Sequence, residues 1–294
     1  MPRSIHAVFF ALNEAPFLRA SVSAVYEFIS GATVVTTYDR DRYGNPVEPE
    51  GLIELILSRQ FDPDRKLQLI VTTEGNEPTT RNRAMAFADR QKRVQPIAGA
   101  PKPLAEPDIF WHIDADEIYD PGDVERLFAW VDTHPSISYR MHLRTYFRTW
   151  NWQVPEVGSF TALTRPRFRF GHIRDPFPSL VNRGWAKARR EGWLSPSRAG
   201  RLTGSLLIPP EVAVCHHGSY VGGRDRIAAK MIRSSHRAEM ADDWLTRVWD
   251  GWEPGMKNLH PTEPSRYPYA THVPTADLPS TIRNADWPEG WIER

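Results

Sequence analysis

The sequence contains one cysteine, almost no net charge and no long hydrophobic run, and each shortage excludes a kind of protein. Cys215 is the only cysteine among 294 residues, so no disulfide can form within the chain, which suits a reducing compartment. The formal net charge of +1 gives no sign of a polyanionic partner. The apolar stretch from Ala7 to Leu12 is too short for a signal peptide, and no run approaches the ~20 apolar residues of a membrane span. We therefore expect a soluble, cytoplasmic protein.

The composition is that of an ordinary globular protein, with 40% hydrophobic and 25% charged residues. Apolar runs alternate with amphipathic segments in the first third, which predicts an α/β fold with a mostly parallel sheet flanked by helices. We expect strands at 5–12, 32–37, 67–72 and 109–113, with helices at 15–29, 50–59 and about 79–90, and from 121 onward. Residues 138–170 alternate like strands of a mixed sheet, and a strand at 212–216 precedes a helix at 224–239.

The segment from Ile109 to Pro121 is the most informative part of the sequence. The apolar run Ile109–Ile113 predicts a buried strand of a parallel sheet. Asp120 is a favourable N-cap and Pro121 suits the first helical position, so a helix should follow at once. Any polar residues between this strand and this helix lie at the strand's carboxyl end, where open α/β sheets bind their ligands.

Three acidic residues stand at that strand end: Asp114, Asp116 and Glu117. If the strand stays extended, Asp114 and Asp116 point to the same side, and two carboxylates facing one space repel unless a cation lies between them. Mg²⁺ and Mn²⁺ take oxygen ligands, often one or two carboxylates plus substrate phosphates. The pattern indicates a metal and phosphate site, and the alternative is a solvated acidic turn before a helix.

This motif resembles the metal and nucleotide motif of GT-A-fold nucleotide-sugar glycosyltransferases. Residues 114–118, Asp-Ala-Asp-Glu-Ile with Pro121 shortly after, are similar to the Asp-x-Asp-Glu-Ile-Pro of glycosyltransferase family 17, the bisecting N-acetylglucosaminyltransferases. Tyr119 stands where that family has its proline, and a looser resemblance is to family 2. The resemblance implies a Mn²⁺- or Mg²⁺-dependent hexosyl- or N-acetylhexosaminyltransferase that uses a nucleotide-diphosphate donor such as a UDP-sugar, with inversion at the anomeric carbon.

Polar residues also follow the other predicted strands of the first third. The candidate nucleotide contacts are Asn13, Glu14, Asp39, Arg81 and Asp114. Each alone is more simply a cap or a turn, but together they share one edge of the predicted sheet. By the family resemblance, Asp39 meets the base and Arg81 meets the base or the diphosphate, as suits an arginine at a helix N-terminus.

A histidine late in the chain resembles a further ligand of this site. His217 begins the run His-Gly-Ser-Tyr-Val-Gly-Gly, which is similar to a family 17 motif that is followed by a helix carrying a lysine, here Lys230. The resemblance implies that Asp116 and His217 hold the cation, while Asp114 contacts the ribose or reaches the metal through water. Lys230 and His236 would contact or position the donor. The alternative for a lone histidine is a structural role.

An inverting transfer needs a base, and an acceptor sugar needs a surface on which to stack. Glu117 and Asp175 are candidate bases, although the sequence does not identify which residue serves. Asp116 counts among the catalytic residues through its cation. Trp150 and Trp152 are candidate acceptor contacts, with packing as the alternative, because eleven tryptophans in one chain more often mean packing.

Positive charge is concentrated between Arg165 and Arg237, where fifteen lysines and arginines face four acids, a net charge of +11. This excess suggests an anionic acceptor, such as a phosphorylated glycan or lipid, or modified DNA. The alternative is a solvated basic surface.

No internal repeat or clear linker appears, so we expect one domain over residues 1–294. Its expected parts are a nucleotide-binding half at 1–135, an acceptor half at 136–243 and a wrapping tail at 244–294 that is rich in tryptophan and proline. A nucleotidyltransferase on a similar sheet is one alternative, but residues 11–15, Ala-Leu-Asn-Glu-Ala, lack the glycine-rich basic loop of such enzymes. A non-catalytic nucleotide- or nucleic-acid-binding protein is the other.

Overall fold

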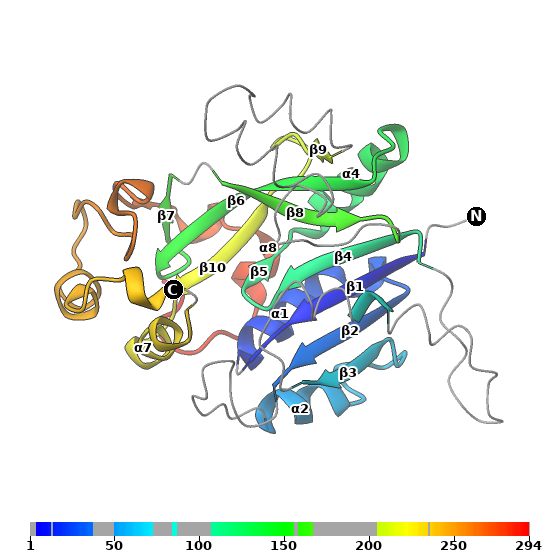
Figure 1. Ribbon diagram of the computed structural model, residues 1–294, viewed down its shortest axis with the longest axis horizontal. Coiled ribbons are helices and arrows are strands. Elements are labelled where there is room, and N and C mark those ends of the chain that lie inside the picture. Colours follow the sequence, from blue (N-terminus) through cyan, green and yellow to red (C-terminus); the bar gives the residue numbers. More distant parts are fainter. Residues whose placement is uncertain are drawn as a thin grey trace.

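The computed structural model describes residues 4–12, 14–37, 50–72, 84–86, 107–155, 158–166, 205–234 and 236–293. Within them the chain forms one mixed sheet of eleven strands flanked by helices (Figure 1). The strands are β1 (Ile5–Phe10), β2 (Gly31–Thr36), β3 (Leu67–Val71), β4 (Ile109–Asp114), β5 (Glu117–Ile118), β6 (Ser138–Arg148), β7 (Trp152–Val154), β8 (Ser159–Thr164), β9 (Ser205–Leu207), β10 (Cys215–Val221) and β11 (Thr271–His272). The predicted fold class is confirmed.

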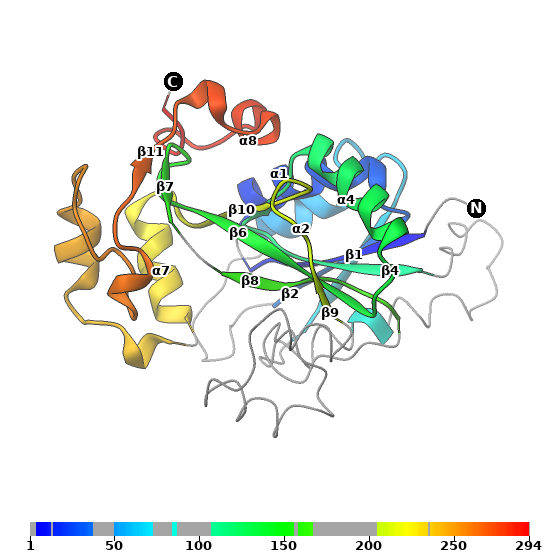
Figure 2. The ribbon, with the colours of Figure 1, turned by 90° about the horizontal axis from the view of Figure 1, so that it is seen from above.

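The first four strands are parallel and run β3-β2-β1-β4 across the sheet. Their middle members are apolar on both faces because both faces are covered. Helices α1 (Ala15–Val25) and α4 (Pro121–Thr133) lie on one face, as Figure 2 shows, and α2 (Glu50–Leu57) packs against α1 on the same side. Residues 84–86 cover the other face, where Met85 belongs to a small apolar cluster with Val8 and Phe110.

Beyond β4 the sheet becomes mixed, as the alternation of residues 138–170 predicts. Strand β8 pairs antiparallel with both β4 and β6, and β7 pairs antiparallel with β6. Strand β10 runs parallel to β6 and antiparallel to β5. This late strand therefore lies beside the short strand that follows the acidic motif, and it brings the histidine region to the end of β4.

Two boundaries differ from the sequence prediction for local reasons. Strand β10 begins at Cys215 rather than Val212, because the amides of Val212 and Ala213 both donate to the carbonyl of Pro209 in a turn. Helix α7 (Arg224–Arg233) ends six residues earlier than the predicted Glu239. Ser234 there adopts an extended backbone conformation, and its hydroxyl accepts the amide of His236 in place of a helical carbonyl.

The tail from Trp244 folds back along the sheet in short pieces separated by prolines. These are a π-helix at Leu245–Asp250, the 3-10 turns Pro264–Arg266 and Thr275–Asp277, strand β11 and helix α8 (Ser280–Asn284), while a further 3-10 turn at Arg237–Glu239 comes just before the tail. Trp244 and Trp249 pack with Phe147 in one buried cluster, whereas Trp287 joins the main core. In the described part of the chain, no helix is both long and apolar enough to cross a membrane.

Candidate functional site

The acidic motif forms a tight turn rather than a longer strand. Strand β4 ends at Asp114, residues 115–116 turn, and β5 begins at Glu117. The carboxylate of Glu117 accepts a hydrogen bond from the backbone amide of Asp114 at 3.0 Å, which closes the turn. The carbonyl of Asp116 accepts the amide of Gly218 at 2.7 Å, so the turn is fixed to β10. The extended conformation that would align Asp114 with Asp116 is therefore absent.

Asp116 lies at the centre of a buried ion cluster. Its side chain is 7% exposed, and its Oδ2 lies 2.7 Å from Lys230 Nζ and 3.5 Å from Arg226 Nη2. Its Oδ1 lies 3.8 Å from Nε2 of His217. Burial alone would raise the pKa of Asp116, but the charges of Lys230, His217 and Arg226 outweigh burial and hold that pKa well below its usual range. Asp116 is therefore a carboxylate at any pH the protein meets.

Arg226 connects this cluster to the end of β1. Its Nη2 lies 2.7 Å from a carboxylate oxygen of Glu14, which begins the turn into α1. Its Nη1 donates to the carbonyls of Ser219 at 3.1 Å and Val221 at 2.8 Å. The guanidinium lies 4.3 Å from the centre of the Phe17 ring. These contacts fix the plane of the guanidinium and join the N-terminus of α1, the turn between β4 and β5, β10 and α7 in one network.

The two adjacent histidines of β10 have different environments. His217 is half-buried, and its Nδ1 lies 3.2 Å from the hydroxyl of Thr145, which turns Nε2 toward Asp116. His216 points to the other face, where its Nδ1 lies 2.8 Å from the Tyr146 hydroxyl. Burial lowers the pKa of His216 to about 3, so this imidazole is neutral at pH 7. Only His217 faces the acidic motif.

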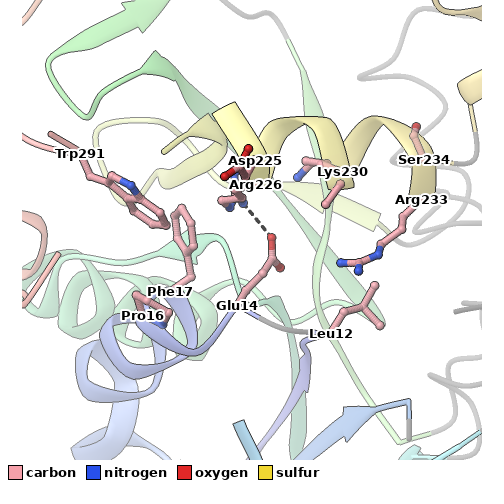
Figure 3. Close-up of a pocket in the computed structure, with 11 residues that line it drawn as sticks. Leu12, Glu14, Pro16, Phe17, Asp225, Arg226, Lys230, Arg233, Ser234 and Trp291 are labelled. Carbon is pink, nitrogen blue, oxygen red and sulfur yellow. Dashed lines mark hydrogen bonds and ion pairs between the residues drawn. The ribbon is translucent and has the colours of Figure 1, made fainter. Parts of the chain in front are cut away.

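A pocket of ≈ 580 Å³ opens beside the ion cluster, between α7 and the start of α1 (Figure 3). Arg226, Lys230 and Arg233 line it from one face of α7, where their spacing of four and three residues places them in a row. Glu14 and Phe17 line the facing side, with Leu12 from the end of β1 and Trp291 from the tail completing the wall. The pocket thus lies at the carboxyl end of the sheet, where the sequence predicts a ligand.

The three-ligand metal set is not assembled. Among the residues that the structure describes, no three His, Cys, Asp or Glu side chains gather closely enough to hold a metal ion. Asp116 and His217 do lie side by side, but Asp114 does not complete a group with them because the chain turns directly after it. The proposed metal ligands are therefore reduced to a pair.

Two other candidate site residues have structural roles in this structure. Glu117 is 3% exposed, and its carboxylate closes the turn, so it is not placed to take a proton from an acceptor. Trp150 is fully buried among Phe17, Tyr146 and Trp287, so packing explains it and its ring has no open face for a sugar.

The remaining predicted contacts lie apart from the pocket or outside the described residues. Trp152 is half-buried on β7, and its indole donates to Glu293. His236 is exposed and pairs with Glu239 at 3.2 Å. Asn13, Asp39, Arg81 and Asp175 lie outside the described residues, as does most of the basic stretch, from 167 to 204.

The structure adds residues that the sequence reasoning missed. Arg226 and Arg233 could have been found from their spacing with Lys230 on one helix face. Phe17 and Trp291 carry no such signal, because only the folded tail brings them together at the pocket.

No protein-family model matches the chain, and no curated protein matches it. Among solved structures, the chain is similar to S. aureus TarS 1-349, with 10% identity over 78% of this chain and 64% of that chain and a TM-score of 0.39. It is also similar to S. aureus TarS, with 12% identity over 79% of this chain and 40% of that chain and a TM-score of 0.39.

A third similar structure is glucosyl-3-phosphoglycerate synthase from Mycobacterium tuberculosis in complex with Mn²⁺, UDP and phosphoglyceric acid. It shares 13% identity over 77% of this chain and 74% of that chain, with a TM-score of 0.40. The chain spans less than two thirds of the two TarS structures it matches. Likeness this distant assigns no function, which has to come from the site itself.

Proposed function

We propose that the protein is a metal-dependent glycosyltransferase that moves a sugar from a nucleotide-diphosphate donor to an acceptor hydroxyl. The observation that carries this proposal is the buried carboxylate of Asp116, held by Lys230 and Arg226 at the edge of a pocket beyond the carboxyl ends of β1 and β4. Such a position is where α/β sheets bind nucleotides, and the Asp-x-Asp resemblance names the donor class.

The charges around the pocket indicate what a diphosphate would need. Arg226 and Lys230 are already balanced by Glu14 and Asp116, so they offer orientation and hydrogen bonds rather than spare charge. Arg233, further along the same face of α7, supplies a further cation. Asp225 also lines the pocket and opposes that charge, so an anionic donor diphosphate would need a divalent cation to offset it.

Asp116 and His217 are the pair that would hold such a cation. Their facing atoms are 3.8 Å apart, whereas adjacent ligands of an octahedral ion, each ~2.1 Å from it, stand ~3 Å apart, so the two side chains would move closer together on binding. The remaining positions would be filled by phosphate oxygens and water. When bound, the ion would act as a Lewis acid and template for the leaving diphosphate.

The protein's own groups would bind and orient the donor. Lys230 and Arg233 would donate hydrogen bonds to phosphate oxygens from α7, and Thr145 keeps Nε2 of His217 directed at Asp116. Phe17 and Pro16 form the apolar side of the pocket and exclude water from it. Asp114 remains our candidate for the ribose, and Asp39 and Arg81 our candidates for the base.

Inversion and an anionic acceptor belong to the same proposal. Asp175 is the remaining candidate base now that Glu117 is committed to the turn. The net +11 between Arg165 and Arg237 supports an acceptor with phosphates, either on a glycan or lipid or in modified DNA.

A thermal-shift screen with UDP-glucose and UDP-N-acetylglucosamine, with and without Mn²⁺, tests the proposal. A ligand that binds only the folded protein stabilises it by ~2.7 kcal/mol at about 100 times its Kd, so binding should raise the Tm. Lys230→Ala should abolish the shift, whereas Lys257→Ala, at an exposed site in the tail, should keep it. If no UDP-sugar raises the Tm of the wild-type protein, the proposal is wrong.

A further inference from the structure

The segment 288–293 at the end of the tail is fastened beside the pocket by hydrogen bonds at two of its residues. The carbonyl of Trp291 accepts the amide of Trp150 at 2.9 Å. Glu293 is held at every polar group: its amide donates to Asn151 at 2.8 Å and its carbonyl accepts the Thr275 hydroxyl at 2.7 Å. Its carboxylate accepts the Trp152 indole at 3.0 Å and lies 2.8 Å from Nε2 of His272.

This anchoring places the ring of Trp291 in the pocket wall. The ring centre lies 5.0 Å from that of Phe17 and 6.0 Å from that of Trp287. A Cβ atom on Gly222 would stand 2.9 Å from Cζ2 of Trp291, so the backbone just after β10 lies directly against the indole ring. Trp291 is therefore tightly packed although it comes from the tail.

The same ring stands beside the guanidinium that joins the two acidic residues of the site. Arg226 lies 4.3 Å from the Phe17 ring centre and 5.9 Å from the Trp291 ring centre, with its side chain 13% exposed. Its Nη1 and Nη2 are taken by Glu14, Asp116 and two backbone carbonyls, whereas its Nε is buried without a hydrogen-bond partner. Aromatic faces attract and restrain a guanidinium, more strongly when water is excluded.

We propose that Trp291 is a positioning residue for the donor site. By packing against Arg226 and Phe17, it holds the guanidinium in the plane that bridges Glu14 and Asp116, and so keeps the pocket ready for a diphosphate before the donor arrives. This proposal rests on the proposed function for its ligand, but the positioning itself does not depend on any ligand.

The first test measures the affinity for UDP by calorimetry in the presence of Mn²⁺. Trp291→Ala should weaken UDP binding about tenfold, which is the loss expected when a partly desolvated cation–π contact no longer restrains the Arg226 guanidinium. Trp291→Phe keeps an aromatic ring and should restore most of the affinity. The matched control is Trp252→Ala, because Trp252 is a half-buried tail tryptophan whose ring lies 5.9 Å from a different arginine, Arg148. Equal loss in both alanine variants would mean that general tail packing, not positioning, sets the affinity.

The second test needs no ligand and separates the two proposals. In the wild-type protein the buried Nε–H of Arg226 should give a slowly exchanging nitrogen signal, assigned by its loss in Arg226→Lys. Trp291→Ala should broaden or lose that signal and Trp252→Ala should not. An unchanged Arg226 signal in Trp291→Ala overturns the positioning role. A wild-type protein that shows the ordered signal but binds no UDP overturns the proposed function alone.

Discussion

The Asp116 carboxylate is buried beside two cationic side chains, so its removal has two separate consequences. One is the loss of a ligand for the proposed cation. The other is that Lys230 would be left near the pocket without the charge that balances it, whereas Arg226 would keep its ion pair with Glu14. An uncompensated buried charge costs far more than a lost surface ion pair.

We therefore predict that Asp116→Ala abolishes transfer and also lowers the free energy of unfolding by ~3 kcal/mol, because the partly buried Lys230 loses its partner. Urea unfolding at pH 7 measures the second effect. Asp242→Ala, at an exposed position just before the tail, is the control and should change stability by less than ~0.5 kcal/mol. Normal activity of Asp116→Ala in chelator-treated buffer would remove Asp116 from the site.

Tyr26 offers a pH-dependent prediction away from the pocket. Its hydroxyl donates to Asp62 at 2.7 Å and accepts the amide of Asp64 at 3.0 Å. Burial first, and then the hydrogen bond to Asp62, raise the pKa of Tyr26 above its ordinary value near 10. A raised pKa means that the stabilisation is complete below the unfolded value and is lost as the pH rises through the folded value.

The free energy of unfolding of the wild-type protein should therefore fall as the pH rises above about 10. Tyr26→Phe should begin less stable by about 1 kcal/mol, because Asp62 loses a hydrogen bond, but should show a shallower fall over the same range. Urea unfolding at pH 8, 10 and 11 checks both slopes. Parallel slopes would show that other groups dominate the alkaline transition.

At the scale of secondary-structure elements, α7 does two things for the site. One face of the helix presents Arg226, Lys230 and Arg233 to the pocket. Gly222 and Gly223 connect the end of β10 to the N-terminus of α7. The turn that they form directs the helix back over the end of β1. Changes at either place should affect binding for different reasons.

Arg233→Ala should weaken UDP binding more than tenfold, because a charged hydrogen bond to a phosphate is worth ~1.5–3 kcal/mol. Calorimetry at two salt concentrations measures the change, which should shrink at high salt. Lys257→Ala serves as the charge-matched control away from the pocket. If Arg233→Ala binds UDP as tightly as the wild-type protein, Arg233 does not contact the diphosphate, and only Arg226 and Lys230 of α7 remain as candidates.

The two glycines before α7 give a matched pair of substitutions. Gly222 has a φ of +125°, and an added Cβ would stand 2.9 Å from Trp291. Gly222→Ala should therefore destabilise the protein by about 1–3 kcal/mol and also weaken UDP binding. Gly223 has a φ of −76° with open space around it, so Gly223→Ala should cost less than ~1 kcal/mol. Equal effects on stability would show that the space at Trp291 is not limiting.

At the scale of the whole molecule, charge is distributed unevenly along the chain. The basic stretch from Arg165 to Arg237 carries a net +11 in a protein whose total is +1. A single diphosphate with a bound cation needs less positive charge than this, so the acceptor is where the excess would act.

An anionic acceptor should therefore bind with a KM that rises steeply with salt, with a slope of about 0.9 per neutralised phosphate if the acceptor is duplex DNA. The double variant Arg189→Ala with Arg190→Ala should flatten this dependence. A KM that is independent of salt in both proteins would show that the basic stretch is a solvated surface with no role in acceptor binding. A small neutral sugar acceptor gives that result.

The sequence predicts the described strands and helices of residues 1–135 well because their signals are local. The apolar run before Asp114, the cap at Asp120 and the alternation of strand and helix each depend on a few neighbouring residues. Asp116, His217 and Lys230 are brought together as the motif resemblance implies.

The turn at residues 115–116 and the places of Trp150 and Trp291 could not be predicted from the sequence, because they depend on contacts between distant parts of the chain. The turn at residues 115–116 follows from where the Glu117 carboxylate finds a partner. Eleven tryptophans cannot be sorted into buried and pocket-lining by their neighbours in sequence, so the sequence leaves sugar contact and packing open for Trp150 and gives no sign of Trp291.

The ion pair between Glu14 and Arg226 joins residues 212 positions apart, and Trp291 closes the wall beside them. During synthesis, the strands β1 to β4 can pair long before Arg226 leaves the ribosome. At ~5–20 residues per second, a further interval of about 3–13 s separates Arg226 from Trp291. The nascent chain would thus contain a folded sheet with an incomplete pocket. The proposed donor could bind tightly only after the tail had docked.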